Sequence, residues 1–148
     1  MEIIDFIEYE DKDTLIAQIE AFDWSAAKFL AKLLNEKKFH DTLGDGTLYI
    51  LLDGEKIVSF ATLTHQDCIN DKTLYPWIGF VFTSPAYRGN RYSERLIIHI
   101  CNEAKEKSFE KVYLATDHIN LYEKFGFVYM ENRFDVYGDD SRVYYRNV

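Results

Sequence analysis

The sequence has few residues of the kinds that build disulfide frameworks or metal centres. Only two of its 148 residues are cysteine, and Cys68 and Cys101 lie in unlike contexts without metal-type spacing. No other group of residues has metal-ligand spacing, and no Ser/His/Asp set can be argued from spacing. We therefore expect reduced thiols in a cytoplasmic protein and no bound metal.

Positive charge and long apolar runs are also scarce. The chain has 17 Lys and Arg against 25 Asp and Glu, a net charge of −8. Nucleic-acid phosphates need a basic face, so nucleic acid is not an expected partner, whereas a cationic substrate suits this charge. No apolar run approaches membrane-spanning length, and Met1–Asp5 has no basic region before an apolar stretch. We expect neither a membrane span nor a signal peptide.

Apolar and aromatic residues, in contrast, are plentiful. They make up 47% and 16% of the chain, which is enough for a packed core and argues against disorder. The length fits one domain and leaves no room for a second, so we expect residues 1–148 to form a single domain.

The stretch from Trp77 to Lys107 organises the rest of the chain. Trp77–Thr83 is a nearly continuous apolar run, typical of a strand covered on both faces, and Pro85 ends it. Apolar residues then recur at helical spacing, with lysines in the last turn. They are Leu96, Ile97, Ile100, Cys101 and Ala104. The predicted order is strand, basic turn, helix.

The turn between that strand and helix has the chemistry of an anion site. The first amides of a helix lack partners and carry partial positive charge, and two arginines precede them. Gly89 lets the backbone come close, and Asn90 is the expected N-cap, leaving the amides of 91–94 pointing outward. An ordinary connection with solvated arginines is the alternative. The chain has no G-x-G-x-x-G and no G-x-x-x-x-G-K-[ST].

At these residues the chain resembles the GNAT superfamily of acyl-CoA-dependent N-acyltransferases. Thr83–Gly89 matches the approach to the family's [QR]-x-x-G-x-[GA] loop, and Arg88 fills its first position. Arg91 and Ser93 stand where the family has Gly and Gly or Ala. Downstream, Leu121–Phe127 is similar to the family's L-Y-x-K-x-G-F segment.

The resemblance implies a fold and a cosubstrate. The fold is α/β (α+β): a mixed, mostly antiparallel central sheet with a parallel pair joined by the CoA-binding helix, and helices on both faces. The cosubstrate is acetyl-CoA. Its pyrophosphate and pantetheine would contact Val81, Phe82, Thr83, Arg88, Gly89, Asn90, Arg91, Tyr92, Ser93 and Glu94.

The resemblance also places Tyr122 near the CoA sulfur, as general acid or thiolate donor. A tyrosine that only packs on the sheet is the alternative. Ala115 occupies a position where many members have asparagine, and the central strand lacks the glutamate that several members place there. The general base is therefore left open among His65, Asp67, Asp71 and His118.

We expect the chain to transfer an acetyl group to a primary amine of a small molecule or a peptide, and its acidic charge suits a cationic acceptor. A catalytically degenerate acyl-CoA-binding sensor or interaction module is the main alternative, and a structural protein with an accidental motif is the third. The identity of the acceptor, and whether the chain forms a homodimer, are left open.

The remaining patterns predict the other elements. The first half should contain a strand at Ile3–Tyr9, a helix capped by Asp13, a helix from Trp24–Ser25, and a hairpin of Leu48–Leu52 with Ile57–Leu63. By resemblance, the two helices form a wall of the acceptor site that includes Trp24. The polar loop His65–Thr73 carries acceptor contacts or has no role.

The second half should add a strand at Lys111–Thr116 and a short helix capped by Asp117 and stopped by Gly126. Three further strands are predicted at Phe127–Met130, Phe134–Tyr137 and Arg142–Tyr145.

Overall fold

The structure is a computed structural model that describes all 148 residues, and it is built on one seven-stranded sheet. The strand order is β1-β2-β3-β4-β5-β7-β6. The strands are β1 (Glu2–Asp5), β2 (Gly46–Asp53), β3 (Lys56–Thr64), β4 (Trp77–Thr83), β5 (Lys111–Thr116), β6 (Val128–Phe134) and β7 (Asp140–Asn147). All neighbours are antiparallel except β4 and β5, which confirms the predicted mixed sheet.

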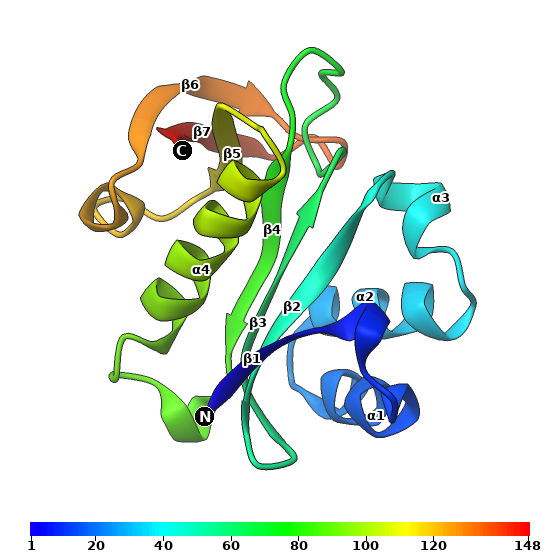
Figure 1. Ribbon diagram of the computed structural model, residues 1–148. Coiled ribbons are helices and arrows are strands. Elements are labelled where there is room, and N and C mark those ends of the chain that lie inside the picture. The colour runs from blue at the N-terminus through cyan, green and yellow to red at the C-terminus, as the bar shows by residue number, and fades with distance from the viewer.

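Helices cover both faces of the sheet, as predicted (Figure 1). The helices α1 (Lys12–Ala21), α2 (Ser25–Asn35) and α3 (Phe39–Leu43) lie on one face, and α4 (Tyr92–Glu106) lies on the other. Each side has its own apolar core, one that includes Leu30 of α2 and one that includes Ile100 of α4. Both side chains are fully buried, because the apolar stripes of these helices face the sheet.

A bulge interrupts β4 near its middle. Phe60 pairs with Phe82 and Thr62 with Gly79, so Phe80 and Val81 together oppose Ala61. Phe80 has a φ of 51°, in the left-handed region. A bulge takes backbone groups out of the ladder and redirects the side chains beside it, and bulges are enriched next to active sites.

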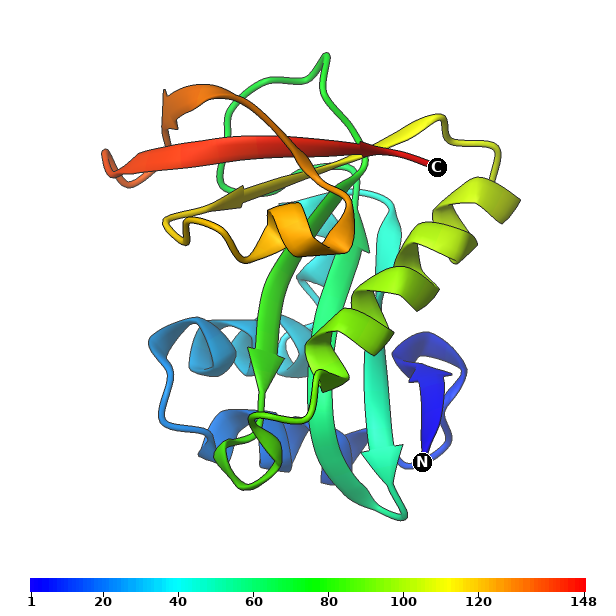
Figure 2. The same ribbon diagram turned by 90° about the vertical axis from the view of Figure 1, so that its left-hand side faces the viewer.

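The sheet opens beyond this bulge, between β4 and β5. The two strands pair only through Trp77 with Tyr113 and Ile78 with Leu114. Afterwards β4 continues to pair with β3 as far as Thr83, while β5 follows β7. Figure 2 shows the two strands running in different directions past this point. The second half of β4 therefore has one edge without a strand partner.

At the N-terminus, the predicted boundaries were partly wrong. The strand ends at Asp5, and a 3-10 helix, η1 (Phe6–Glu8), replaces its predicted second half. The Asp5 carboxylate accepts a hydrogen bond from the Ile7 amide at 3.0 Å, which turns the chain. Asp11 rather than Asp13 caps α1, because its side chain accepts from the Thr14 amide. The short helix α3 had not been predicted.

Two predictions near the C-terminus also need correction. Asp117 caps no helix, and the predicted helix is a 3-10 turn, η3 (Tyr122–Phe125), which ends at Gly126 as expected. Phe134–Tyr137 is not a separate strand. Phe134 ends β6, and Asp135 then folds the chain by accepting hydrogen bonds from the amides of Tyr137 and Asp139.

No helix has the length and hydropathy needed to cross a membrane.

Candidate active site

The loop that leads into α4 is held by its own side chains. After β4, a 3-10 turn, η2 (Pro85–Tyr87), directs the chain outward. The Tyr87 hydroxyl donates to the Asp53 carboxylate at 3.0 Å, which ties the loop to the β2–β3 turn. Asn90 Nδ2 donates to the carbonyls of Tyr87 and Arg88 at 3.1 and 3.3 Å. Asn90 is thus a brace within the loop, and its predicted role as N-cap was wrong.

The N-cap of α4 is Arg91, and its side chain makes no capping hydrogen bond. The amides of the first helical turn, which includes Ser93, therefore have no side-chain acceptor. Gly89 has a φ of 86°, and its Cα faces open space, with no atom within 4 Å of an added Cβ. Free amides beside an open backbone at a helix N-terminus suit an anion such as a pyrophosphate.

Arg91 stands where the resembled motif has glycine, and its backbone conformation is one that glycine favours. Its φ of 60° and ψ of 28° lie in the left-handed region, which glycine occupies without cost. Arg91 adopts it here and forms an ion pair with Glu94, with 3.1 Å between Nε and Oε2. Residue 91 of this loop thus adopts, without glycine, a backbone conformation that glycine favours.

Two substitutions separate the backbone of Arg91 from its charge. Arg91→Gly and Arg91→Ala both remove the guanidinium, but only alanine keeps a Cβ in the left-handed conformation. We expect the glycine variant to be the more stable of the two by about 1 kcal/mol, measured by urea unfolding. Equal stabilities would mean that the loop does not hold residue 91 in this conformation.

Arg88 places positive charge where β4 meets the loop. Its Nε donates to the Thr83 carbonyl at 3.0 Å, and its guanidinium lies 5.4 Å from the centre of the Phe82 ring. The side chain is exposed, so its other N–H groups are available to a ligand.

Tyr122 lies on the α4 side of the sheet, with its ring buried among Phe125, Phe127 and Tyr144. No group of the protein hydrogen-bonds its hydroxyl. The oxygen still reaches the surface, since the only fully buried side-chain polar atoms without partners are Thr62 Oγ1 and Arg146 Nη1. Burial, with a smaller effect from Asp117, raises the pKa of Tyr122 to about 12. The phenol therefore keeps its proton at neutral pH.

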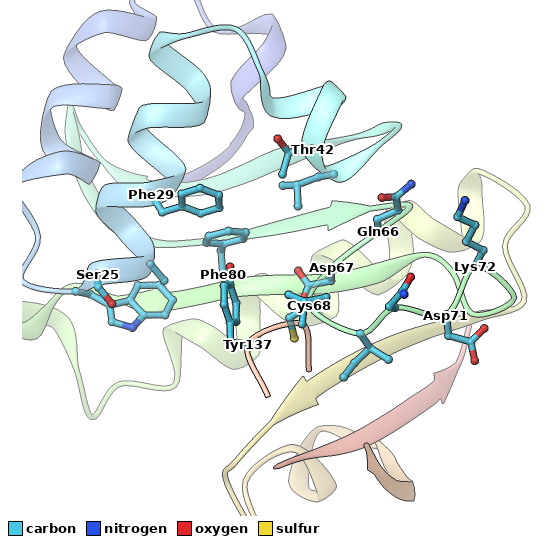
Figure 3. A pocket seen from close by; sticks show the side chains of 16 residues that line it. Ser25, Phe29, Thr42, Gln66, Asp67, Cys68, Asp71, Lys72, Phe80 and Tyr137 are labelled. Carbon is cyan, nitrogen blue, oxygen red and sulfur yellow. The ribbon is translucent and has the colours of Figure 1, made fainter. Parts of the chain in front are cut away.

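A pocket of about 820 Å³ lies on the opposite face, beside the bulge (Figure 3). Its wall includes the start of α2, the end of α3, Phe80 of β4, and Val136 with Tyr137. The β3–β4 loop closes another side, with residues 66–72. Figure 3 shows Phe29 and Phe80 facing each other, and their ring centres are 6.4 Å apart. Trp24 lies on this wall and the polar loop lines the pocket directly, whereas α1 contributes no residue to it.

Two of the four general-base candidates do not line this pocket. His65 stacks on Tyr75, with 4.3 Å between ring centres. His118 lies near the Tyr122 ring, at 6.5 Å, on the other face of the sheet. Neither side chain belongs to the pocket wall.

The other two candidates, Asp67 and Asp71, both line the pocket but differ in their surroundings. Asp71 accepts hydrogen bonds from Thr73 and forms an ion pair with Arg133 at 2.7 Å, and these contacts lower its pKa to about 2. Burial instead raises the pKa of Asp67. A carboxyl group with a raised pKa is better matched to proton transfer near neutral pH than one held strongly ionised.

The sequence does not predict Phe29, Phe80 or Tyr137 as pocket residues. Aromatic side chains at such positions look like core or sheet packing from their spacing alone. One available signal was Gly79, because a glycine inside an apolar strand indicates a bulge or a close approach by another group. Within the structure, no three metal-ligating side chains come together.

Comparison with known proteins agrees with this geometry. Residues 7–127 match the model of the acetyltransferase (GNAT) family. A search of curated proteins finds no significant match. Among solved structures, a protein from Bacillus anthracis described as a streptothricin acetyltransferase, in complex with acetyl coenzyme A, is 25% identical, with a TM-score of 0.58. The similarity covers 70% of this chain and 63% of that one.

Two further structures share the fold over nearly the whole chain. The aminoglycoside 6'-N-acetyltransferase from Enterococcus faecium has a TM-score of 0.72 at 14% identity, covering 99% of this chain and 97% of that one. A GNAT family acetyltransferase from Elizabethkingia anophelis with acetyl-CoA bound has a TM-score of 0.66 at 15% identity, with the same coverage. The family match over residues 7–127, on a fold shared with these solved structures, shows that this chain belongs to the GNAT family of acetyltransferases.

Proposed function

We propose that this chain, as one domain spanning residues 1–148, transfers the acetyl group of acetyl-CoA to a primary amine of a small acceptor. The observation that carries the proposal is the opening of the sheet between β4 and β5. The α4 loop and Tyr122 lie on one side of it, and the pocket beside Phe80 lies on the other. An amine in the pocket and a thioester on the α4 side would meet there without a covalent enzyme intermediate.

The residues beside the opening fit a CoA chain. The free amides of the first turn of α4, from Tyr92 to Glu94, would hold the pyrophosphate with Arg88 and Arg91. Gly89 would let the phosphates approach, and Asn90 would keep the loop in shape. The backbone of Val81, Phe82 and Thr83, which lacks a strand partner on the β5 side, would hydrogen-bond the pantetheine arm.

Acetyl-CoA supplies an acyl thioester whose sulfur must leave as a thiol. Tyr122 fits the role of proton donor, because its hydroxyl is protonated at neutral pH, reaches the surface and has no competing partner in the protein. A hydrogen bond that strengthens as charge develops on sulfur lowers the barrier without tightening ground-state binding.

The acceptor site indicates a small amine. The relatives described above are named for acetylation of streptothricin and of aminoglycosides, both small molecules. The pocket volume of about 820 Å³ falls in the range of small-molecule sites. Its charged lining consists of Lys72, Asp71, which is paired with Arg133, and Asp67, which has no cationic partner. Asp67 and the net charge of −8 favour an amine that arrives as a cation.

The direct test of this function is release of CoA thiol from acetyl-CoA in the presence of an amine panel. The panel would include amino acids, polyamines, aminoglycosides and peptide N-termini, and CoA binding would be measured by calorimetry in parallel. Binding of CoA with amine-dependent thiol release supports the proposal. Binding without release by any amine would instead indicate an acyl-CoA sensor, and absence of binding would contradict both.

A prediction for the cosubstrate site concerns Arg88. Arg88→Ala should weaken CoA about 10- to 100-fold, because it removes a charge-assisted contact to phosphate. It should also reduce the salt dependence of binding. Arg88→Lys is the matched control, since it keeps the charge but loses the Nε hydrogen bond to the Thr83 carbonyl. Its CoA affinity should fall between those of the unaltered protein and the alanine variant. Unchanged affinity of the alanine variant, measured by calorimetry, would place the phosphates elsewhere.

A further inference from the structure

The carboxylate of Asp67 occupies the space that a side chain at Gly79 would fill. A Cβ built on Gly79 would lie 2.2 Å from Asp67 Oδ1 and 2.9 Å from its Cγ. Gly79 is therefore required by the presence of this carboxylate. The β3–β4 loop thus delivers an acidic group to the surface of β4, one residue before the bulge at Phe80.

Asp67 has no cation to neutralise it. It takes part in none of the ion pairs of the structure, and its polar contacts come from its neighbour Cys68. The side chain is only partly buried and lines the pocket. A carboxylate without a cationic partner, beside a mostly apolar cavity, is a favourable site for a cationic ligand.

We propose that Asp67 is a catalytic residue that receives the ammonium group of the acceptor and takes its proton, and that Gly79 exists to make room for it. This role rests on the proposed acetyltransferase function. It fills the gap left by a central strand without Asp or Glu. The carboxylate comes from the loop beside the strand, on the pocket side of the sheet.

The proton balance follows directly. The ammonium group gives one proton to the Asp67 carboxylate, which leaves a neutral amine with a free electron pair. That pair forms the new C–N bond as the C–S bond breaks. The nitrogen then loses a second proton, which balances the proton taken up by sulfur, and Asp67 returns its own proton to solvent. The products are the amide and the free thiol, and no oxidant or reductant is needed.

The test is Asp67→Asn, which keeps the shape of the side chain and removes its charge and basicity. We expect amine-dependent thiol release to fall about 10²-fold or more, with CoA affinity unchanged. In the unaltered protein kcat/KM should fall at acid pH as Asp67 becomes protonated, and the variant should lack this dependence. Asp45→Asn, an exposed residue before β2, is the matched control and should keep the rate.

The melting temperature of Asp67→Asn gives a second readout, because a catalytic and a purely structural role predict changes of opposite sign. Because the pKa of Asp67 is raised by folding, the native state binds its proton more tightly than the unfolded chain does. Stability is therefore lost as pH rises through that pKa, and the ionised group destabilises the fold at neutral pH. Asp67→Asn should melt at a higher temperature than the unaltered protein at pH 7. A residue kept for structure would lower the melting temperature when replaced.

These measurements distinguish the role of Asp67 from the acetyltransferase function on which that role rests. If the unaltered protein turns over amines, and Asp67→Asn keeps both the full rate and the fall in kcat/KM at acid pH, the role of Asp67 alone is overturned. Absence of turnover by the unaltered protein, with CoA still bound, would overturn the acetyltransferase proposal and this role with it. We expect Asp67→Asn to be slow, with normal CoA affinity, a raised melting temperature and no fall in kcat/KM at acid pH.

Discussion

Tyr122→Phe should lower kcat about 10²-fold while leaving CoA affinity nearly unchanged. The substitution removes one oxygen atom and keeps the ring, which packs against Phe125 and Phe127. Since the hydroxyl has no hydrogen-bond partner in the protein, its removal should not disturb the fold. The loss should appear in kcat rather than in the KM for acetyl-CoA, because the contact strengthens as charge develops on sulfur.

Tyr113→Phe provides a matched control for this experiment. Tyr113 is a half-buried tyrosine on β5 whose ring lies 5.6 Å from that of Trp77, and it plays no part in the proposed site. It should keep the full rate. Full activity of the Tyr122 variant as well would show that Tyr122 only packs, and the thiolate would then leave without its help.

Gly79→Ala should cost about 10²-fold in rate, although it adds only a methyl group, because a displacement of about 1 Å in a catalytic group has that effect. The added carbon would overlap the Asp67 carboxylate at 2.2 Å, so this carboxylate must move. Gly79 is not among the glycines with positive φ, so alanine fits the backbone and the loss comes from the contact. CoA affinity, measured by calorimetry, should stay the same.

A double-mutant cycle identifies the cause of that loss. In an Asp67→Ala background the carboxylate is already absent, so adding Gly79→Ala should change the remaining rate very little. Additive losses in the two variants would mean that Gly79 serves the backbone of β4 and not Asp67. A Gly79→Ala variant with the full rate would show that the position of this carboxylate does not matter.

The sequence alone determined the order of the central elements and the family. The apolar run Trp77–Thr83, the proline that ends it and the helical spacing from Leu96 to Ala104 are local patterns, and local patterns select strand, turn and helix. The hairpin of β2 and β3 was predicted for the same reason. Tyr122 and the basic turn became candidates because they stand at fixed offsets within motifs of the family.

The tertiary structure decided the details that depend on neighbours distant in the chain or on side-chain hydrogen bonds. Asn90 was the expected N-cap because asparagine favours that position. In the structure its side chain instead donates to the Tyr87 and Arg88 carbonyls, and Arg91 takes the N-cap position. The first strand was predicted too long because its end depends on a hydrogen bond from Ile7 to Asp5.

The candidate base shows the same division most clearly. The sequence offered four polar residues on loops as candidates. It could not rank them, because neither burial nor ion pairing is visible from spacing. Folding pairs Asp71 with Arg133, stacks His65 on Tyr75, and places Asp67 against Gly79 in the pocket wall. The pKa of a carboxyl group is set by desolvation and nearby charges. Those are properties of the packed molecule, so only the tertiary structure could distinguish one aspartate from another.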